Sequence, residues 1–261
     1  MGGTAMKKLI ILTLLLCATS NSKISTEYQV KLKTNSLIGH QPSYIFSILE
    51  LHLQKHVEIS KSIKMTKVFN STIHFIDKRT KVRSRCSLYD DDDITLKYDS
   101  PVLNELIYLT KHHKPNNETV KIEQDVYGKF SKFAISYTKD RRCDPIKNMS
   151  DIKYIFKNNQ LLEEFDNHYP IKTSDTVYIR RYKGFNVIHK GSELSLVLDL
   201  VFPNEKSAYS DSLEELLSSE LSFRVRSDKN KDLATKVFTL LLNNFPLADK
   251  GYMIKSPDYF Y

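Results

Sequence analysis

The sequence predicts an α+β fold in which an antiparallel β-barrel with a polar interior dominates and helices lie at its periphery. First, polar residues stand at every second position from Glu27 to Lys33, and alternate side chains of a strand share one face. Second, the same alternation of charged residues recurs at 83–85, 121–123 and 220–224. Third, many short strand-like segments surround only a few helical ones. Charged faces on several strands indicate a barrel whose interior is polar, and that interior is the expected functional site.

Ten segments have the composition and alternation of strands. They are 26–34, 67–77, 81–89, 93–98, 118–127, 130–138, 176–183, 185–189, 193–202 and 218–226. The acidic run 90–93 is predicted to be a solvated hairpin turn between two of them. A calcium loop is a poor alternative for this run, because no EF-hand spacing follows.

Four segments have an apolar stripe at helical spacing and begin at a residue that favours a helix start. They begin near Pro42, Ser100, Ser150 and Ser227. Their stripes are predicted to pack against the sheet.

The first 22 residues have the pattern of a signal peptide. Lys7 and Lys8 precede an apolar run, 9–17, and small residues follow at 18–20. The prediction is therefore a signal peptide over 1–22, one mature domain over 23–261, and a secreted or periplasmic location. The apolar run is short for a bilayer, and no transmembrane span is expected in the mature chain. A membrane anchor or a buried N-terminal strand remains the alternative for this segment.

Removal of residues 1–22 would leave two cysteines, Cys86 and Cys143. An exported chain with an even pair is compatible with one disulfide, and two unpaired buried thiols are the alternative. The cysteines have no CxxC or Cys/His neighbourhood, so a zinc site is not expected. The net charge of +8 would become +6 without Lys7 and Lys8. Bases interspersed with carboxylates indicate an anionic ligand, and no nucleic acid is expected because no helix-turn-helix, finger or RNA-stacking signature is present.

The order of the charged motifs resembles the CYTH, or triphosphate tunnel metalloenzyme, superfamily over roughly residues 26 to 255. The motifs are Glu27-x-Gln29-x-Lys31, Arg83-x-Arg85, Leu96-Lys97 before Pro101, Lys121-x-Glu123, Arg180 or Arg181, Leu198-Asp199, Glu220-x-Ser222 and Lys250. The resemblance implies a tunnel-like barrel and a metal-dependent phosphohydrolase that acts on a triphosphate or polyphosphate group.

The resemblance also implies roles for individual residues. Arginine offers planar bidentate donors to phosphate oxygens, and lysine offers a point charge. The expected substrate-binding residues are Lys33, Arg83, Arg85, Lys97, Arg180 and Lys250. Lys31 and Glu123 are the expected catalytic residues, and Glu123 would position the attacking water. Mg²⁺ or Mn²⁺ would be held by Glu27, Asp199 and Glu220. Arg181 and Lys183 are expected to lie outside the site, because Arg180 and Arg181 cannot both face inward.

Two departures from the family pattern open an alternative function. Gln29 and Ser222 stand where the family has metal-binding glutamates. Neutral oxygens can bind a divalent cation, but without charge, and Asp77 or Glu193 could supply the missing acid. The alternative is a non-catalytic protein that binds phosphate or another polyanion on the same fold. A cyclase or an RNA-capping activity is disfavoured by the predicted export, and capping would return if residues 1–22 were not a signal.

Overall fold

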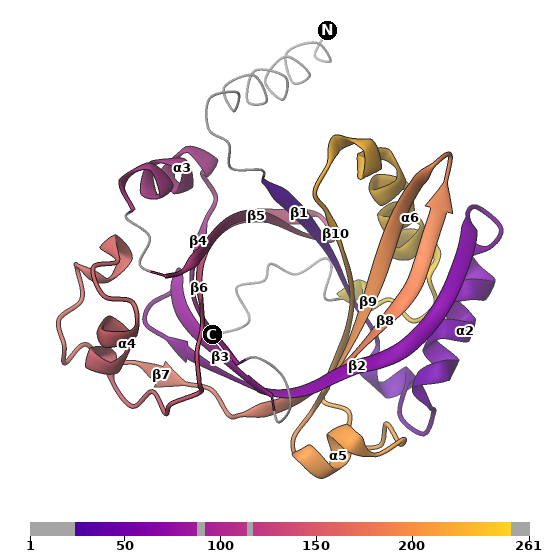
Figure 1. Cartoon of the computed structure of the whole chain (residues 1–261). Coiled ribbons are helices and arrows are strands. Elements are labelled where there is room, and N and C mark those ends of the chain that lie inside the picture. The colour runs from indigo at the N-terminus through magenta and orange to yellow at the C-terminus, as the bar shows by residue number, and fades with distance from the viewer. Residues whose placement is uncertain (1–23, 88–91, 114–116, 252–261) are drawn as a thin grey trace, which may run out of the picture.

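Ten strands form one sheet in the computed structural model, which describes residues 24–87, 92–113 and 117–251. In their order across the sheet, the strands are β3 (Thr80–Ser87), β4 (Asp93–Ser100), β6 (Phe130–Asp140), β5 (Thr119–Tyr127), β1 (Ser25–Lys31), β10 (Ser218–Val225), β9 (Ser192–Phe202), β8 (Val177–His189), β2 (Glu58–Phe75) and β7 (Lys172–Thr173). Because β2 also pairs with β3, the sheet closes into a ring (Figure 1). The predicted α+β class and the dominance of the sheet are confirmed.

Helices lie outside the ring, as Figure 1 shows. They are α2 (Pro42–Leu53), α3 (Leu103–His112), α4 (Met149–Ile155), α5 (Glu205–Tyr209) and α6 (Lys231–Asn244), with short 3₁₀ turns at Thr34–Ser36, Gln160–Leu162 and Asp228–Asn230. All four predicted helices are present. The third begins at an Asn148 cap rather than at Ser150, because the Asn148 side chain accepts a hydrogen bond from the Asp151 backbone N–H and the Asp151 side chain accepts one from the Asn148 N–H.

The neighbouring strands of the ring are antiparallel with one exception. β1 pairs antiparallel with β10 but parallel with β5. The N-terminal strand thus fills the gap between two strands that are far from it in the sequence. The prediction of an antiparallel sheet is wrong at this single pairing.

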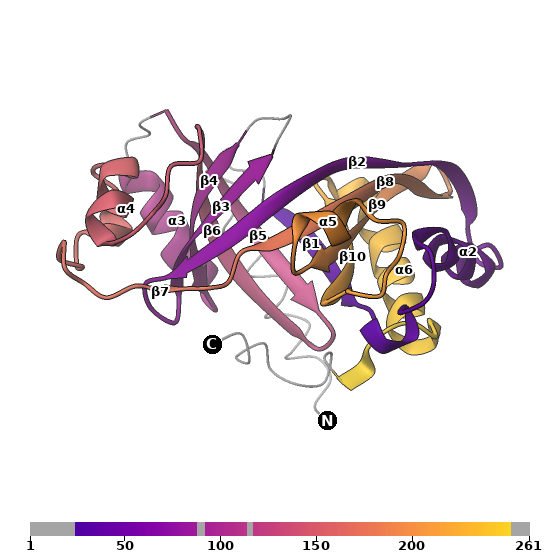
Figure 2. The same ribbon diagram turned by 90° about the horizontal axis from the view of Figure 1, so that it is seen from below.

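Other strand boundaries also differ from the prediction: β1 ends at Lys31 rather than at residue 34, and the two-residue β7 was not predicted. The predicted strands 176–183 and 185–189 form one strand, β8, with an irregularity between Tyr182 and Phe185. β2 begins at Glu58, well before the predicted residue 67, and Figure 2 shows it running from the side of α2 to β7.

Two separate hydrophobic cores cover the outer face of the ring. One lies between the β1, β8, β9 and β10 strands and helices α2 and α6, and includes Leu49, Phe223 and Val237. The other lies between the β3, β4, β5 and β6 strands and helices α3 and α4, and includes Leu96 and Ile152. Since alternate residues of a strand face opposite sides, the polar residues between these apolar ones face the inside of the ring.

Cys86 on β3 and Cys143, which follows β6, form a disulfide across 57 residues. Of the two alternatives for these cysteines, the structure has the disulfide. The predicted signal peptide lies outside the described residues, as do residues 88–91 at the predicted hairpin turn and the chain after residue 251. Within the described parts of the chain, the helices are too short or too polar to cross a membrane.

Gly184 is required where β8 passes β2. Its φ is +94°, and a Cβ at this position would lie 2.2 Å from the Ser62 backbone oxygen. Gly184→Ala is expected to lower the free energy of unfolding by about 3 kcal/mol, because left-handed strain adds to a clash with backbone. The control is Gly191→Ala, where φ is +74° but no atom lies within 4 Å, and the expected loss is about 1 kcal/mol. Urea unfolding of both variants would measure the difference, and equal losses would contradict the close approach.

Candidate functional site

A cavity of about 470 Å³ lies inside the ring, and inward-facing residues of eight strands line it. Its cationic residues are Arg83, Arg85, Lys97, Arg181, Lys183, Arg224 and Arg226. Its acidic residues are Glu27, Glu123, Glu193, Asp199 and Glu220. Val197 is the large apolar residue on its inward face, and Leu194 and Phe223, which also border it, belong to the outer core. The cavity therefore offers many charges and little apolar surface.

Most of the predicted site residues lie in this cavity. They are Glu27, Arg83, Arg85, Lys97, Glu123, Asp199 and Glu220, together with the neutral Gln29 and Ser222. Lys31 lies next to it, with its Nζ 3.2 Å from the Glu220 Oε2. The alternation of charge along the strands was therefore a correct guide to which residues share the interior.

Three predicted substrate-binding residues lie elsewhere. The Lys33 Nζ donates to the Pro246 carbonyl at 3.0 Å, and the Lys250 Nζ donates to the Asn243 carbonyl at 3.0 Å, both at the exposed surface. β1 ends at Lys31, so the alternation that placed Lys33 inside stops before this residue. The predictions for Lys33 and Lys250 are wrong in position.

Arg180 is the third predicted substrate-binding residue outside the cavity, and its neighbour Arg181 lines the cavity instead. Arg180 is 2% exposed, and its guanidinium donates to the carbonyls of Ser207, Ala208 and Ser210. The expectation that Arg180 faces inward and Arg181 outward is wrong, because Arg180 holds the α5 segment against the outside of the ring. Lys183, also expected to lie elsewhere, shares the inward face with Arg181.

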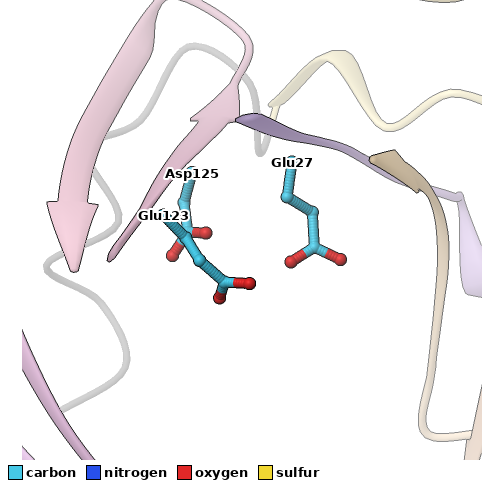
Figure 3. Close-up of side chains that lie close together, drawn as sticks. All are labelled: Glu27, Glu123 and Asp125. Atoms are coloured by element: carbon cyan, nitrogen blue, oxygen red, sulfur yellow. The ribbon is translucent and has the colours of Figure 1, made fainter. Parts of the chain in front are cut away.

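Three carboxylates come together on β1 and β5. One oxygen from each of Glu27, Glu123 and Asp125 lies within 4.8 Å of the others, and Figure 3 shows the three side chains gathered in one place. Glu27 is directly opposite Asp125 in the parallel pairing. Asp125 had no role in the sequence prediction, although its spacing of two from Glu123 was the available signal. Glu27 is the one predicted metal ligand in this group.

The other two predicted metal ligands belong to a different row of charges. Arg181, Asp199, Glu220 and Lys31 are neighbours across four adjacent strands. Arg181 donates Nε to the Asp199 Oδ1 at 2.7 Å and Nη2 to the Oδ2 at 2.6 Å. Asp199 and Glu220 are therefore each paired with a cation of the protein, and they do not join Glu27 in a three-carboxylate group among the described residues.

The Glu27 group is also paired with cations. The Arg224 Nη2 lies 3.0 Å from both the Glu27 Oε2 and the Glu123 Oε1. The Lys97 Nζ lies 2.7 Å from the Asp125 Oδ2. Burial lowers the pKa of Arg224, but Glu27 and Glu123 outweigh it and raise the pKa overall.

These contacts decide how well a divalent metal fits. Carboxylate oxygens are the ligands that Mg²⁺ and Mn²⁺ prefer. However, Arg224 already contacts two of the three carboxylates, and Lys97 contacts the third. The group therefore does not fit a resident metal as it stands, because the ion would have to displace a guanidinium.

Arg83 and Arg85 combine two features, of which Lys183 and Arg226 share the first and Arg224 the second. Neither forms an ion pair with a carboxylate of the described residues, and the Nε of each is buried without a hydrogen-bond partner there. Burial lowers the pKa of Arg83. Burial, with the neighbouring Arg83, lowers the pKa of Arg85 to about 9. The Phe69 ring lies 5.4 Å from the Arg85 guanidinium and 5.3 Å from that of Arg181. An anion bound here would supply the negative charge that Arg83 and Arg85 lack in an ion pair.

Burial raises the pKa of Glu220, and Asp199 adds to this while Lys31 opposes it. A carboxyl whose pKa is raised on folding contributes stability below its ordinary value of 4.5 and loses it as the pH rises through the folded value. We expect the free energy of unfolding to fall over the pH range above 4.5 in the wild type, and to fall less in Glu220→Gln. Urea unfolding of both proteins across that range measures this, and parallel curves would contradict it.

Comparisons with known proteins do not assign the chain to a family. No protein-family model matches it, and no curated protein matches it. A chain of the solved Mediator head module from Schizosaccharomyces pombe is similar over 86% of this chain and 97% of that chain, at 10% identity and a TM-score of 0.36. A similarity at this level carries no argument about fold or function.

Proposed function

We propose that the ring is a tunnel-like barrel whose interior binds a phosphate-rich anion, such as a triphosphate or a polyphosphate group. The observation that carries the proposal is the pair of inward arginines, Arg83 and Arg85, which have no carboxylate partner among the described residues. Guanidinium groups bind phosphate oxygens through planar, charge-assisted hydrogen bonds. Lys183 lines the same cavity and adds further positive charge, whereas the charge of Arg181 is paired with Asp199.

Calorimetric titration of the chain with tripolyphosphate tests this proposal. Binding of one equivalent is expected, and it should weaken with added salt because the contacts are ionic. The double variant Lys33→Gln/Lys250→Gln removes two positive charges outside the cavity and should bind as the wild type does. Absence of binding by the wild type at low salt would refute the proposal.

Metal-dependent hydrolysis of the same group is the second candidate function, and the close approach of Glu27, Glu123 and Asp125 favours it. In this candidate, Arg83 and Arg85 hold the anion and Glu123 holds the attacking water. Lys31, paired with Glu220 beside the cavity, would contribute positive charge. The ion pairs of the carboxylates count against it, as do the neutral Gln29 and Ser222 at two cavity positions.

Release of phosphate from tripolyphosphate, long-chain polyphosphate and ATP separates the two candidates. The measurement is made with Mg²⁺, with Mn²⁺ and with chelator, on the wild type and on Glu123→Gln. Metal-dependent release that is lost in Glu123→Gln would establish the hydrolase. Binding without release, unchanged by chelator, would establish the binding protein. The predicted export and the disulfide are compatible with a protein that meets its ligand outside the cytosol.

A further inference from the structure

Arg224 holds a central position among the cavity carboxylates. It stands directly opposite Glu27 in the β1–β10 pairing. Its Nη2 is equidistant from Glu27 and Glu123, at 3.0 Å from an oxygen of each. One nitrogen thus bridges carboxylates that belong to two different strands, as a bound cation would.

The charges of this group come close to balance without any added ion. Three carboxylates, Glu27, Glu123 and Asp125, face two cations, Arg224 and Lys97. Glu123 and Asp125 are 7% and 2% exposed, so unpaired charges here would be costly. The next inward-facing pair along β1 and β10 adds no acid, because it consists of the neutral residues Gln29 and Ser222.

We infer that Arg224 is a built-in cation that takes the place a divalent metal would occupy between Glu27 and Glu123, so that the cavity binds no metal there. A metal ion would compete with Arg224 for the same two carboxylates and would be repelled by the guanidinium and by Lys97. A phosphate-rich anion in this cavity would then be neutralised by the cationic side chains of the protein and not by a metal ion. That consequence rests on the proposed anion binding, whereas the placement of Arg224 does not.

The inference is tested by titrating Mn²⁺ into the protein and following free Mn²⁺ by its paramagnetic resonance signal. The wild type is expected to show no stoichiometric binding. Arg224→Gln removes the bridging charge and leaves the three carboxylates, so it should bind one Mn²⁺ per chain at an affinity at least about 100-fold above any residual, non-stoichiometric binding by the wild type. Arg226→Gln makes the same charge change at a cavity residue two positions along and should behave as the wild type.

Two results would overturn the inference. One is stoichiometric Mn²⁺ binding by the wild type that Glu27→Gln abolishes. The other is a folded Arg224→Gln protein, with the circular dichroism of the wild type, that binds no Mn²⁺. If Arg224→Gln does not fold, Arg224→Lys and the wild type decide instead, since both keep the cation and neither should bind Mn²⁺. Tripolyphosphate titration in chelator on the same samples tests anion binding separately, so failure of the proposed function is distinguishable from failure of this inference.

Discussion

Replacement of Arg83 and Arg85 together by glutamine is expected to weaken tripolyphosphate binding by about 100-fold or more. Each arginine should make charge-assisted hydrogen bonds to the anion, and each such bond contributes about 1.5 to 3 kcal/mol. Both arginines line the cavity, and neither forms an ion pair within the described residues that the anion would have to break. Calorimetric titration measures the loss. Wild-type affinity in the double variant would show that the anion binds elsewhere.

The same double variant should be more stable than the wild type when no anion is present. Burial lowers the pKa of both guanidinium groups, which means that the folded state disfavours their charge. Two arginines that served the fold through ion pairs would have the opposite effect. Urea unfolding without ligand measures this difference, and a loss of stability would show that the two side chains also support the fold.

Removal of the disulfide through Cys86→Ser/Cys143→Ser is expected to lower the free energy of unfolding by about 4 kcal/mol, the effect of opening a loop of this length in the unfolded chain. The bond joins residues 57 apart and fixes the segment after β6 to the end of β3. The Cys143 backbone N–H also donates to the Asp92 carboxylate at 3.1 Å. Urea unfolding of the variant and of the wild type measures the effect.

Reductant provides the control for this prediction. It should lower the stability of the wild type to that of the double variant and leave the variant unchanged. Because Cys86 follows Arg85 directly, the variant also tests whether the bond supports the cavity. A variant as stable as the oxidised wild type would show that the cores alone hold this part of the ring.

The sequence predicted most of the sheet because alternation of polar and apolar residues is a property of each strand taken alone. β9 illustrates this: Leu196, Leu198 and Leu200 pack in an outer core while Asp199 lies in the cavity. The beginning of β2 was missed because the exposed Lys61 lies between Ile59 and Ile63 and interrupts their apolar alternation, although both isoleucines pack against an outer core. The parallel pairing of β1 with β5 was missed because pairing partners leave no trace in a single strand.

The same distinction explains the errors at the site. The choice between Arg180 and Arg181 depended on the phase of β8 relative to the ring, which the sequence of β8 does not fix. Asp199 lies opposite Arg181 and forms two hydrogen bonds with it, a complementarity that becomes visible only after the strands are paired. Lys33 was placed inside because the alternation continues in the sequence after the strand has ended.

The position of β1 has a consequence for how the chain reaches its native state. Its partners lie about one hundred and two hundred residues further along the chain, since Glu27 pairs with Asp125 and with Arg224. During synthesis the β5 partner of this strand emerges when about half of the protein has been made, and the β10 partner only when almost all of it has. Contacts between residues so far apart in the sequence slow folding, because closing the intervening loop costs entropy before the contact can stabilise the chain. The two arcs of sheet, each with its own apolar core, already meet where β2 pairs with β3, and insertion of β1 between β5 and β10 is then the step that closes the ring around the charged interior.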